Sequence, residues 1–170
     1  MINIRPAKIS DAQSLLHLFS TLESESDFML MEPGERSQSL EQQRTILGHF
    51  SSTSTGLFFI AEGESNKGII GFIVGKAGTA SRNRHCISLV IGILQSYSGK
   101  GLGKQMIEKH LEWSSTQNYH RIELTVMSHN EQAIRLYKSC LFEVEGTKRD
   151  ALKINGKYVD ELYMSRILPQ

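Results

Sequence analysis

The chain has 170 residues and a formal net charge of +1, and 22% of its residues are charged, as in an ordinary soluble globular protein. Its length suffices for a single domain, residues 1–170, that buries a core without disulfides or a structural metal. The balanced charge excludes a general surface for nucleic acid or for an acidic membrane, because such a surface needs a clustered excess of basic residues.

Targeting and metal-binding signals are absent from the sequence. The N-terminal residues lack the apolar stretch of a signal peptide, and no window reaches the length of a transmembrane segment. Cys86 and Cys140 lie far apart, and the six histidines form no paired motif. We therefore expect a cytoplasmic protein with free thiols, no metal, and neither nucleic acid nor membrane as a partner.

The first half of the chain predicts a β-α opening followed by an antiparallel hairpin. A short strand precedes Ser10-Asp11, which can cap a helix whose apolar residues share one face. The segment 23–39 mixes acidic residues with Met, Pro and Gly without a sustained period, which is typical of a long loop. The expected elements are, in order, a strand over 2–6, a helix over 12–22, this loop, a polar helix over 40–50, and strands over 57–62 and 69–75 joined by a turn over 65–68.

The second half alternates strands and helices and ends in a hairpin. Residues 85–93 form a nearly continuous apolar run, as in a central strand covered on both faces, and Gly92 within it predicts a β-bulge. The strand-loop-helix-strand order that follows implies a crossover and parallel pairing over part of the sheet. Asn155-Gly156 is a strong signal for a hairpin turn. The further elements are a helix over 102–115, a strand over 121–126, a helix over 131–140 capped by Asn130, and hairpin arms over 142–154 and 157–168.

A glycine-rich run, Ser98-Gly99-Lys100-Gly101-Leu102-Gly103-Lys104, connects the central strand to the helix after it. Glycines at alternate positions allow a tight backbone path that a Cβ would obstruct. The helix that begins in this run presents unpaired N–H groups to whatever lies in the loop. The run therefore favours the binding of an anion such as phosphate.

Two common phosphate-binding motifs do not fit this run. A P-loop would need glycine where Ser98 stands and a magnesium-binding hydroxyl where Gln105 stands. A dinucleotide fingerprint would need glycine in place of Lys104 or Met106, depending on where it starts. A nucleotide-binding switch is disfavoured for the same reason, because no magnesium-ligating hydroxyl follows Lys104.

The run instead resembles the acyl-CoA pyrophosphate loop of the GCN5-related N-acetyltransferase (GNAT) family, Arg/Gln-x-x-Gly-x-Gly/Ala. Downstream, the segment from Asn130 to Gly146 is similar to the family's N-x-x-A-x-x-L-Y-x-x-x-G-F-x-x-E-G stretch, and residues 156–164 match its G-x-Y-x-D-x-x-x-M hairpin. Ser98 replaces the family's Arg or Gln, and Leu141 replaces a glycine. The first change removes a side chain but leaves the backbone donors in place. The resemblance covers the whole chain and implies an α/β fold with a mixed central sheet of about six to seven strands and flanking helices.

The resemblance implies where acetyl-CoA binds. Its pyrophosphate would lie on the N–H groups from Gly99 to Lys104, and its pantetheine arm would lie along the edge of the central strand. A backbone N–H of Gly92 or Ile93 would polarise the thioester carbonyl, and Asn130 would contact the arm or shape the helix start. The implied cofactor-binding residues are Ile91, Gly92, Ile93, Ser98, Gly99, Lys100, Gly101, Leu102, Gly103, Lys104, Asn130 and Tyr137.

The resemblance also assigns the catalytic acid and the acceptor pocket. Tyr137, which by itself would be read as a core residue, would protonate the departing CoA thiolate. The family places the wall of its acceptor pocket in the segment 23–39, where Glu25, Asp27, Phe28 and Glu32 would suit a cationic amine with some apolar surface. An exposed acidic loop without a ligand is the alternative interpretation.

The sequence therefore predicts an acetyl-CoA-dependent N-acetyltransferase without a metal. Its acceptor would be a primary amine of a small molecule or of a protein N-terminus, attacking the thioester directly in a ternary complex. The alternative is a CoA-binding regulatory or structural module without turnover. Members of the family are often homodimers, and the resemblance extends that expectation to this chain.

Overall fold

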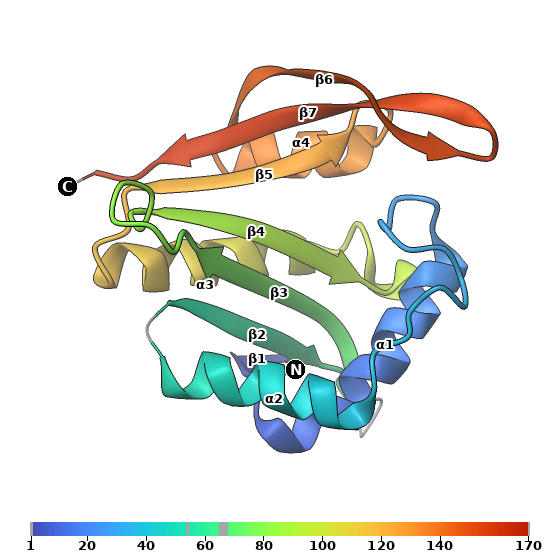
Figure 1. Ribbon diagram of the computed structural model, residues 1–170, viewed down its shortest axis with the longest axis vertical. Helices are drawn as coiled ribbons and strands as arrows, with labels where there is room; N and C mark the ends of the chain where they lie inside the picture. Colours follow the sequence, from blue (N-terminus) through green and yellow to red (C-terminus); the bar gives the residue numbers. More distant parts are fainter. Residues whose placement is uncertain (1, 54, 65–67, 170) are drawn as a thin grey trace.

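The computed structural model describes residues 2–53, 55–64 and 68–169. In this part of the chain, seven strands form one mixed sheet in the order β1-β2-β3-β4-β5-β7-β6, with helices on both faces (Figure 1). The predicted fold class is therefore confirmed. The strands are β1 (Asn3–Pro6), β2 (Gly56–Glu62), β3 (Ile69–Ala77), β4 (Cys86–Ile93), β5 (Arg121–Met127), β6 (Glu143–Ile154) and β7 (Lys157–Ile167). The helices are α1 (Ala12–Glu25), α2 (Leu40–Ser52), α3 (Leu102–Thr116) and α4 (Glu131–Ser139), with 3-10 turns over Ile9–Asp11 and Gln95–Tyr97.

Strands β4 and β5 pair in parallel at one end only and then separate. Their paired residues are 86–88 and 121–123. Beyond these residues, β4 stays paired with β3 as far as Ile93, while β5 stays paired with β7 as far as Met127. Figure 1 shows the two strands diverging. Residues 89–93 of β4 therefore have one edge without a neighbouring strand, which agrees with the predicted parallel pairing over part of the sheet.

The core lies in two layers because side chains alternate between the faces of β2 and β3. Phe58 and Phe72 pack with the apolar faces of α1 and α2. Phe59 and Ile73 point to the opposite face and pack with the apolar residues of α3. Helices α1 and α2 thus cover one face of the sheet over β2 and β3, and α3 and α4 cover the other face (Figure 1).

Helix α1 extends to Glu25 rather than ending at Leu22, so the loop that follows it begins at Ser26. The polar residues at its end suggested a loop, but Glu23 is buried and its carboxylate lies 2.6 Å from the guanidinium of Arg36. This ion pair makes an acidic residue compatible with a buried helical position. The predicted turn over 65–68 involves residues 65–67, which lie outside the described residues.

The prediction of a β-bulge at Gly92 is wrong. The register between β3 and β4 runs without a shift through the pair Phe72–Gly92. A Cβ on Gly92 would instead lie 2.6 Å from a ring carbon of Phe72 and 2.8 Å from the Cδ1 atom of Leu22. Close packing against α1, not an irregular backbone, is the reason for glycine at this position.

The closing hairpin forms as predicted. Asn155 and Gly156 have φ values of 49° and 78°, the left-handed conformations that a two-residue hairpin turn requires at both positions. Strand β7 lies between β5 and β6, and the N–H of Ser128 donates to the carbonyl of Asp160 at 2.9 Å. This bond holds β7 beside the segment between β5 and α4.

His110 of α3 is fully buried under the sheet, and burial lowers its pKa to about 4. An unfolded histidine titrates near pH 6.5, so the stability that neutral His110 contributes is present above that pH and is lost as the pH falls toward 4. Between pH 6.5 and 5 we expect the free energy of unfolding to fall by about 2 kcal/mol more in the wild-type protein than in the variant His110→Leu. Urea unfolding at both pH values measures this difference. The control variant His17→Leu, at an exposed position, should lose as much free energy of unfolding between these pH values as the wild type. An equal loss in His110→Leu would refute the role of His110 in this pH dependence.

Candidate active site

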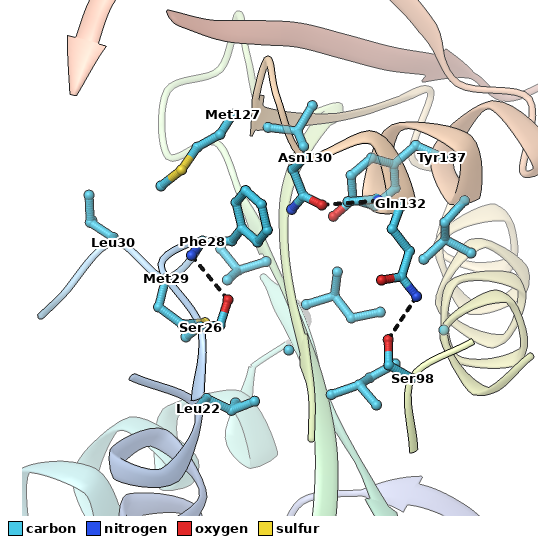
Figure 2. Close-up of a pocket in the computed structure, with 18 of the residues that line it drawn as sticks. Leu22, Ser26, Phe28, Met29, Leu30, Ser98, Met127, Asn130, Gln132 and Tyr137 are labelled. Atoms are coloured by element: carbon cyan, nitrogen blue, oxygen red, sulfur yellow. Dashed lines mark hydrogen bonds between the residues drawn. The ribbon is translucent and has the colours of Figure 1, made fainter. Parts of the chain in front are cut away.

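A cavity of about 1130 Å³ lies where β4 and β5 separate (Figure 2). Its walls come from the end of α1, the loop after it, the open end of β4, the glycine-rich run, the end of β5 and α4. Figure 2 shows Phe28, Met29 and Leu30 on one side, and Asn130, Gln132 and Tyr137 of the β5-α4 segment on the other. The sequence-predicted site residues, with the exception of Lys100, Leu102 and Glu32, thus line one space.

The glycine-rich run has the backbone that an anion site needs. Gly99 and Gly101 have φ values of 72° and 83°, and Gly101 is the residue that precedes α3. No side chain caps α3, so the N–H groups of its first turn are available to an anion. Gly103 has a different role, because a Cβ there would lie 2.8 Å from the Cδ2 atom of Leu136. It allows α3 and α4 to approach closely.

The two lysines of this run are turned toward protein partners. The ammonium group of Lys100 donates to the carbonyl of Ser96 at 2.8 Å, and Lys100 is not part of the cavity wall. Lys104 does line the cavity, and its ammonium group lies 3.8 Å from the carboxylate of Glu108. The side chain of Leu102 is buried in the core, so this residue can offer a ligand only its backbone.

The open edge of β4 presents the backbone groups of alternate residues. The N–H of Gly78 donates to the carbonyl of Cys86, and the N–H of Leu94 donates to the carbonyl of Ile70. Both hydrogen bonds connect the β3 side of the ladder to the β4 side. In an antiparallel ladder such bonded pairs recur at every second residue. The backbone of Gly92 therefore faces β3, and the backbones of Ile91 and Ile93 face the open edge. Of the two predicted oxyanion donors, the register favours Ile93 over Gly92.

Helix α4 positions both of its predicted residues toward the cavity. The side chain of Asn130 caps the helix by accepting a hydrogen bond from the N–H of Ala133 at 3.2 Å. Tyr137 follows about two turns later, so it lies on the same face of the helix. Both residues line the cavity.

Tyr137 is only 7% exposed, and its ring packs 6.1 Å from that of Phe142. Burial raises the pKa of Tyr137 to about 12, and the nearby Cys140 thiol acts in the same direction. Among the described residues, no hydrogen bond engages its hydroxyl. The hydroxyl is therefore protonated across the neutral range and can donate to a group in the cavity.

The side of the cavity that lies across from Tyr137 is mainly apolar. We call its residues Phe28, Met29, Leu30 and Met127 the apolar end of the cavity. The ring of Phe28 lies 5.1 Å from that of His129, so the loop after α1 contacts the β5-α4 segment.

Of the four predicted acceptor residues, Asp27 and Phe28 line the cavity. Glu25 also lines it, but its carboxylate accepts a hydrogen bond from the N–H of Gln95 at 2.9 Å and so joins α1 to the end of β4. Glu32 is outside the cavity wall, because it belongs to a turn in which its N–H donates to the carboxylate of Glu35.

Sequence reasoning missed several cavity residues. Glu161 of β7 lines the cavity, and its carboxylate lies 3.6 Å from the ammonium group of Lys148. Arg36 is also in the wall, but Glu23 and Gln38 engage its guanidinium, which stacks 4.5 Å from the centre of the Phe19 ring. Only the alternation of β7 could have indicated Glu161, and nothing local indicated Arg36.

Within residues 2–53, 55–64 and 68–169, no group of three or more His, Cys, Asp or Glu could hold a metal ion. In the same residues, no helix is both long and apolar enough to span a membrane.

Comparison with known proteins identifies the family. The sequence model of the acetyltransferase (GNAT) family matches residues 18–142, and the chain belongs to this family. It is 32% identical over 103 residues to the L-amino acid N-acetyltransferase AaaT of Escherichia coli, covering 58% of this chain and 62% of that protein. It is 38% identical over 69 residues to the spermidine N(1)-acetyltransferase of Vibrio cholerae, covering 40% of each chain. The matches thus span less than two thirds of these relatives.

Solved structures agree with this assignment. The fold matches that of a GNAT-family acetyltransferase from Streptococcus pneumoniae with a TM-score of 0.94 and 25% identity, covering 99% of this chain and all of the other. It also matches a putative acetyltransferase from Salmonella typhimurium, solved with acetyl-CoA, with a TM-score of 0.87, 16% identity, and coverage of 100% and 95%. The family membership implied by the sequence motifs is therefore confirmed.

Proposed function

We propose that this protein transfers an acetyl group from acetyl-CoA to a primary amine, and that the amine attacks the thioester directly in a ternary complex. The observation that carries this proposal is that one cavity joins the glycine-rich run, the open edge of β4 and Tyr137 to an apolar end with acidic neighbours. The solved acetyl-CoA complex of the Salmonella typhimurium protein supports the choice of donor.

The donor would be held mainly by backbone groups. The N–H groups of the first turn of α3 would bind the diphosphate, helped by the positive end of the helix dipole. The free carbonyl groups of Ile91 and Ile93 would accept hydrogen bonds from the amide N–H groups of the pantetheine arm. The N–H of Ile93 would then stabilise the negative charge that develops on the thioester oxygen.

Tyr137 would act as the general acid. As the amine nitrogen forms its bond to the acetyl carbon, the carbon–sulfur bond breaks and the electron pair leaves with sulfur. The Tyr137 hydroxyl can donate its proton to this sulfur, since its raised pKa keeps it protonated at neutral pH. The incoming amine is a cation at neutral pH and must lose a proton before it attacks.

The charges around the apolar end favour a cationic acceptor that carries no carboxylate beside its amine. Asp27 contributes negative charge to the cavity wall, and Glu161 adds a second carboxylate that is shared with Lys148. Arg36, which also lines the cavity, is already engaged by the buried Glu23. A polyamine or a peptide N-terminus next to an apolar residue therefore fits better than a free α-amino acid, whose carboxylate would lack a partner.

Two measurements test the proposal. Acetyl-CoA at about 100 times its Kd should stabilise the protein by about 2.7 kcal/mol, a rise in melting temperature of about 5–10 °C, whereas ATP and NAD should have little effect. A thiol-release assay should then show turnover with spermidine or a peptide with a free N-terminus, and less with phenylalanine. Equal stabilisation by ATP would contradict the donor site. Stabilisation by acetyl-CoA without turnover on any amine would favour the CoA-binding module instead.

A further inference from the structure

We infer that Gln132, in the first turn of α4, supplies the side-chain contact to the diphosphate of acetyl-CoA that Ser98 is too short to make. This inference rests on the proposed function. Gln132 and Ser98 both line the cavity, although α4 and the glycine-rich run are far apart in the sequence. The side-chain amide of Gln132 donates to the hydroxyl of Ser98 at 2.9 Å (Figure 2).

The short side chain of Ser98 leaves room for this amide beside the backbone of the loop. The Gln132 Nε2 atom lies 3.8 Å from the position that a Cβ on Gly99 would occupy. Gly99 is one of the two left-handed glycines that shape the loop. A side-chain amide is therefore present at the anion site, but it comes from the neighbouring helix instead of from the loop.

The amide has a further hydrogen to donate. A carboxamide nitrogen carries two N–H groups, and the Ser98 hydroxyl accepts one of them. Among the cationic side chains around the loop, Lys100 donates to the carbonyl of Ser96, and Lys104 forms an exposed ion pair with Glu108 at 3.8 Å. Arg135, one turn further along α4, is paired with Glu131. The bond to Ser98 thus holds the amide of Gln132 beside the loop, with its second N–H available to a diphosphate there.

The alternative is that Gln132 only ties α4 to the loop. In that case, removing either partner of the Gln132–Ser98 hydrogen bond would have the same effect. If Gln132 binds the diphosphate directly, Gln132→Ala must weaken acetyl-CoA binding more than Ser98→Ala, and an amide moved onto the loop must compensate. Both residues are exposed, so neither substitution should prevent folding.

The test measures the Kd of acetyl-CoA by calorimetry for five proteins. We expect Gln132→Ala to raise the Kd about tenfold, as for the loss of a hydrogen bond to a charged group, and Ser98→Ala to raise it less than about threefold. The double variant Ser98→Gln with Gln132→Ala should return to within about threefold of wild type. Gln105→Ala, on the exposed side of α3 outside this cavity, should leave the Kd unchanged. In steady-state kinetics of Gln132→Ala, the KM for acetyl-CoA should rise by a larger factor than any fall in kcat.

Four results would overturn the inference. Equal effects of Gln132→Ala and Ser98→Ala, or no recovery in the double variant, would reduce Gln132 to a structural tie. If the wild-type protein does not bind acetyl-CoA, the proposed function fails and this inference fails with it. If wild type binds and Gln132→Ala does not differ from it, only this inference is lost.

Discussion

Replacing Tyr137 with phenylalanine should lower kcat about 100-fold or more and change the Kd of acetyl-CoA less than about threefold. The substitution removes only the hydroxyl and keeps the ring that packs against Phe142, so the core should stay intact. A proton donated as the carbon–sulfur bond breaks stabilises the transition state and not the bound ground state. Removing the hydroxyl should therefore lower kcat and leave the binding of acetyl-CoA nearly unchanged. Steady-state kinetics together with calorimetric titration separate the two quantities.

The pH dependence of the rate gives a second test of the same hydroxyl. Since burial raises the pKa of Tyr137 to about 12, its titration should not shape the rate between pH 6 and 9. The rates of the wild-type protein and of Tyr137→Phe should rise in the same way with pH, because both follow deprotonation of the amine. Tyr158→Phe is the matched control, because Tyr158 is 65% exposed on the closing hairpin and outside the cavity. A Tyr137→Phe rate equal to that of the control would return Tyr137 to a purely structural role.

The variant Gly92→Val should lower the free energy of unfolding by about 3 kcal/mol. A Cβ at this position would lie 2.6 Å from the ring of Phe72. That ring cannot easily yield, because it packs edge-on at 5.0 Å against Phe19 and 5.9 Å from Phe58. The Cδ1 atom of Leu22 would be 2.8 Å away, so α1 would also have to shift.

This shift should also reach the cavity. Leu22 and the loop after α1 both line it, so we expect the KM for the amine to rise more than the KM for acetyl-CoA. Val90 lies on the same face of β4 but is 55% exposed, and Val90→Ile should change stability by less than about 0.5 kcal/mol. Urea unfolding of both variants makes the comparison. A loss below about 1 kcal/mol in Gly92→Val would show that the packing around Gly92 can adapt.

Features that depend on neighbouring residues in the sequence could be predicted. The left-handed conformations of Gly99, Gly101 and Gly156 follow from glycine's freedom at turns, and the structure has them. Asn130 and Tyr137 share a face of α4 because about two helical turns separate them, and both reach the cavity. Partial parallel pairing of β4 and β5 followed from the order of the elements.

Features that depend on contacts between distant segments could not be predicted from the sequence. Gly92 signalled an irregularity, but whether this meant a bulge or a close neighbour depended on where α1 packs. Glu25 and Glu32 looked alike in the sequence, yet one joins α1 to Gln95 and the other belongs to a turn outside the cavity. Gln132 carried no signal, because its significance depends on a hydrogen bond to a loop 34 positions earlier.

By itself, the sequence determined the order of strands and helices, the glycine-shaped backbone of residues 98–104 and the family. These features depend on local conformational preferences and on motif spacing, which the sequence contains directly. Tertiary structure alone decided which side chains surround the cavity and how its charges are compensated. The pairing of Arg36 with Glu23 and the approach of Gln132 to Ser98 exist only because packing brings separate elements together. Burial and charge compensation arise only in the folded protein, so they decide the chemical character of the apolar end of the cavity.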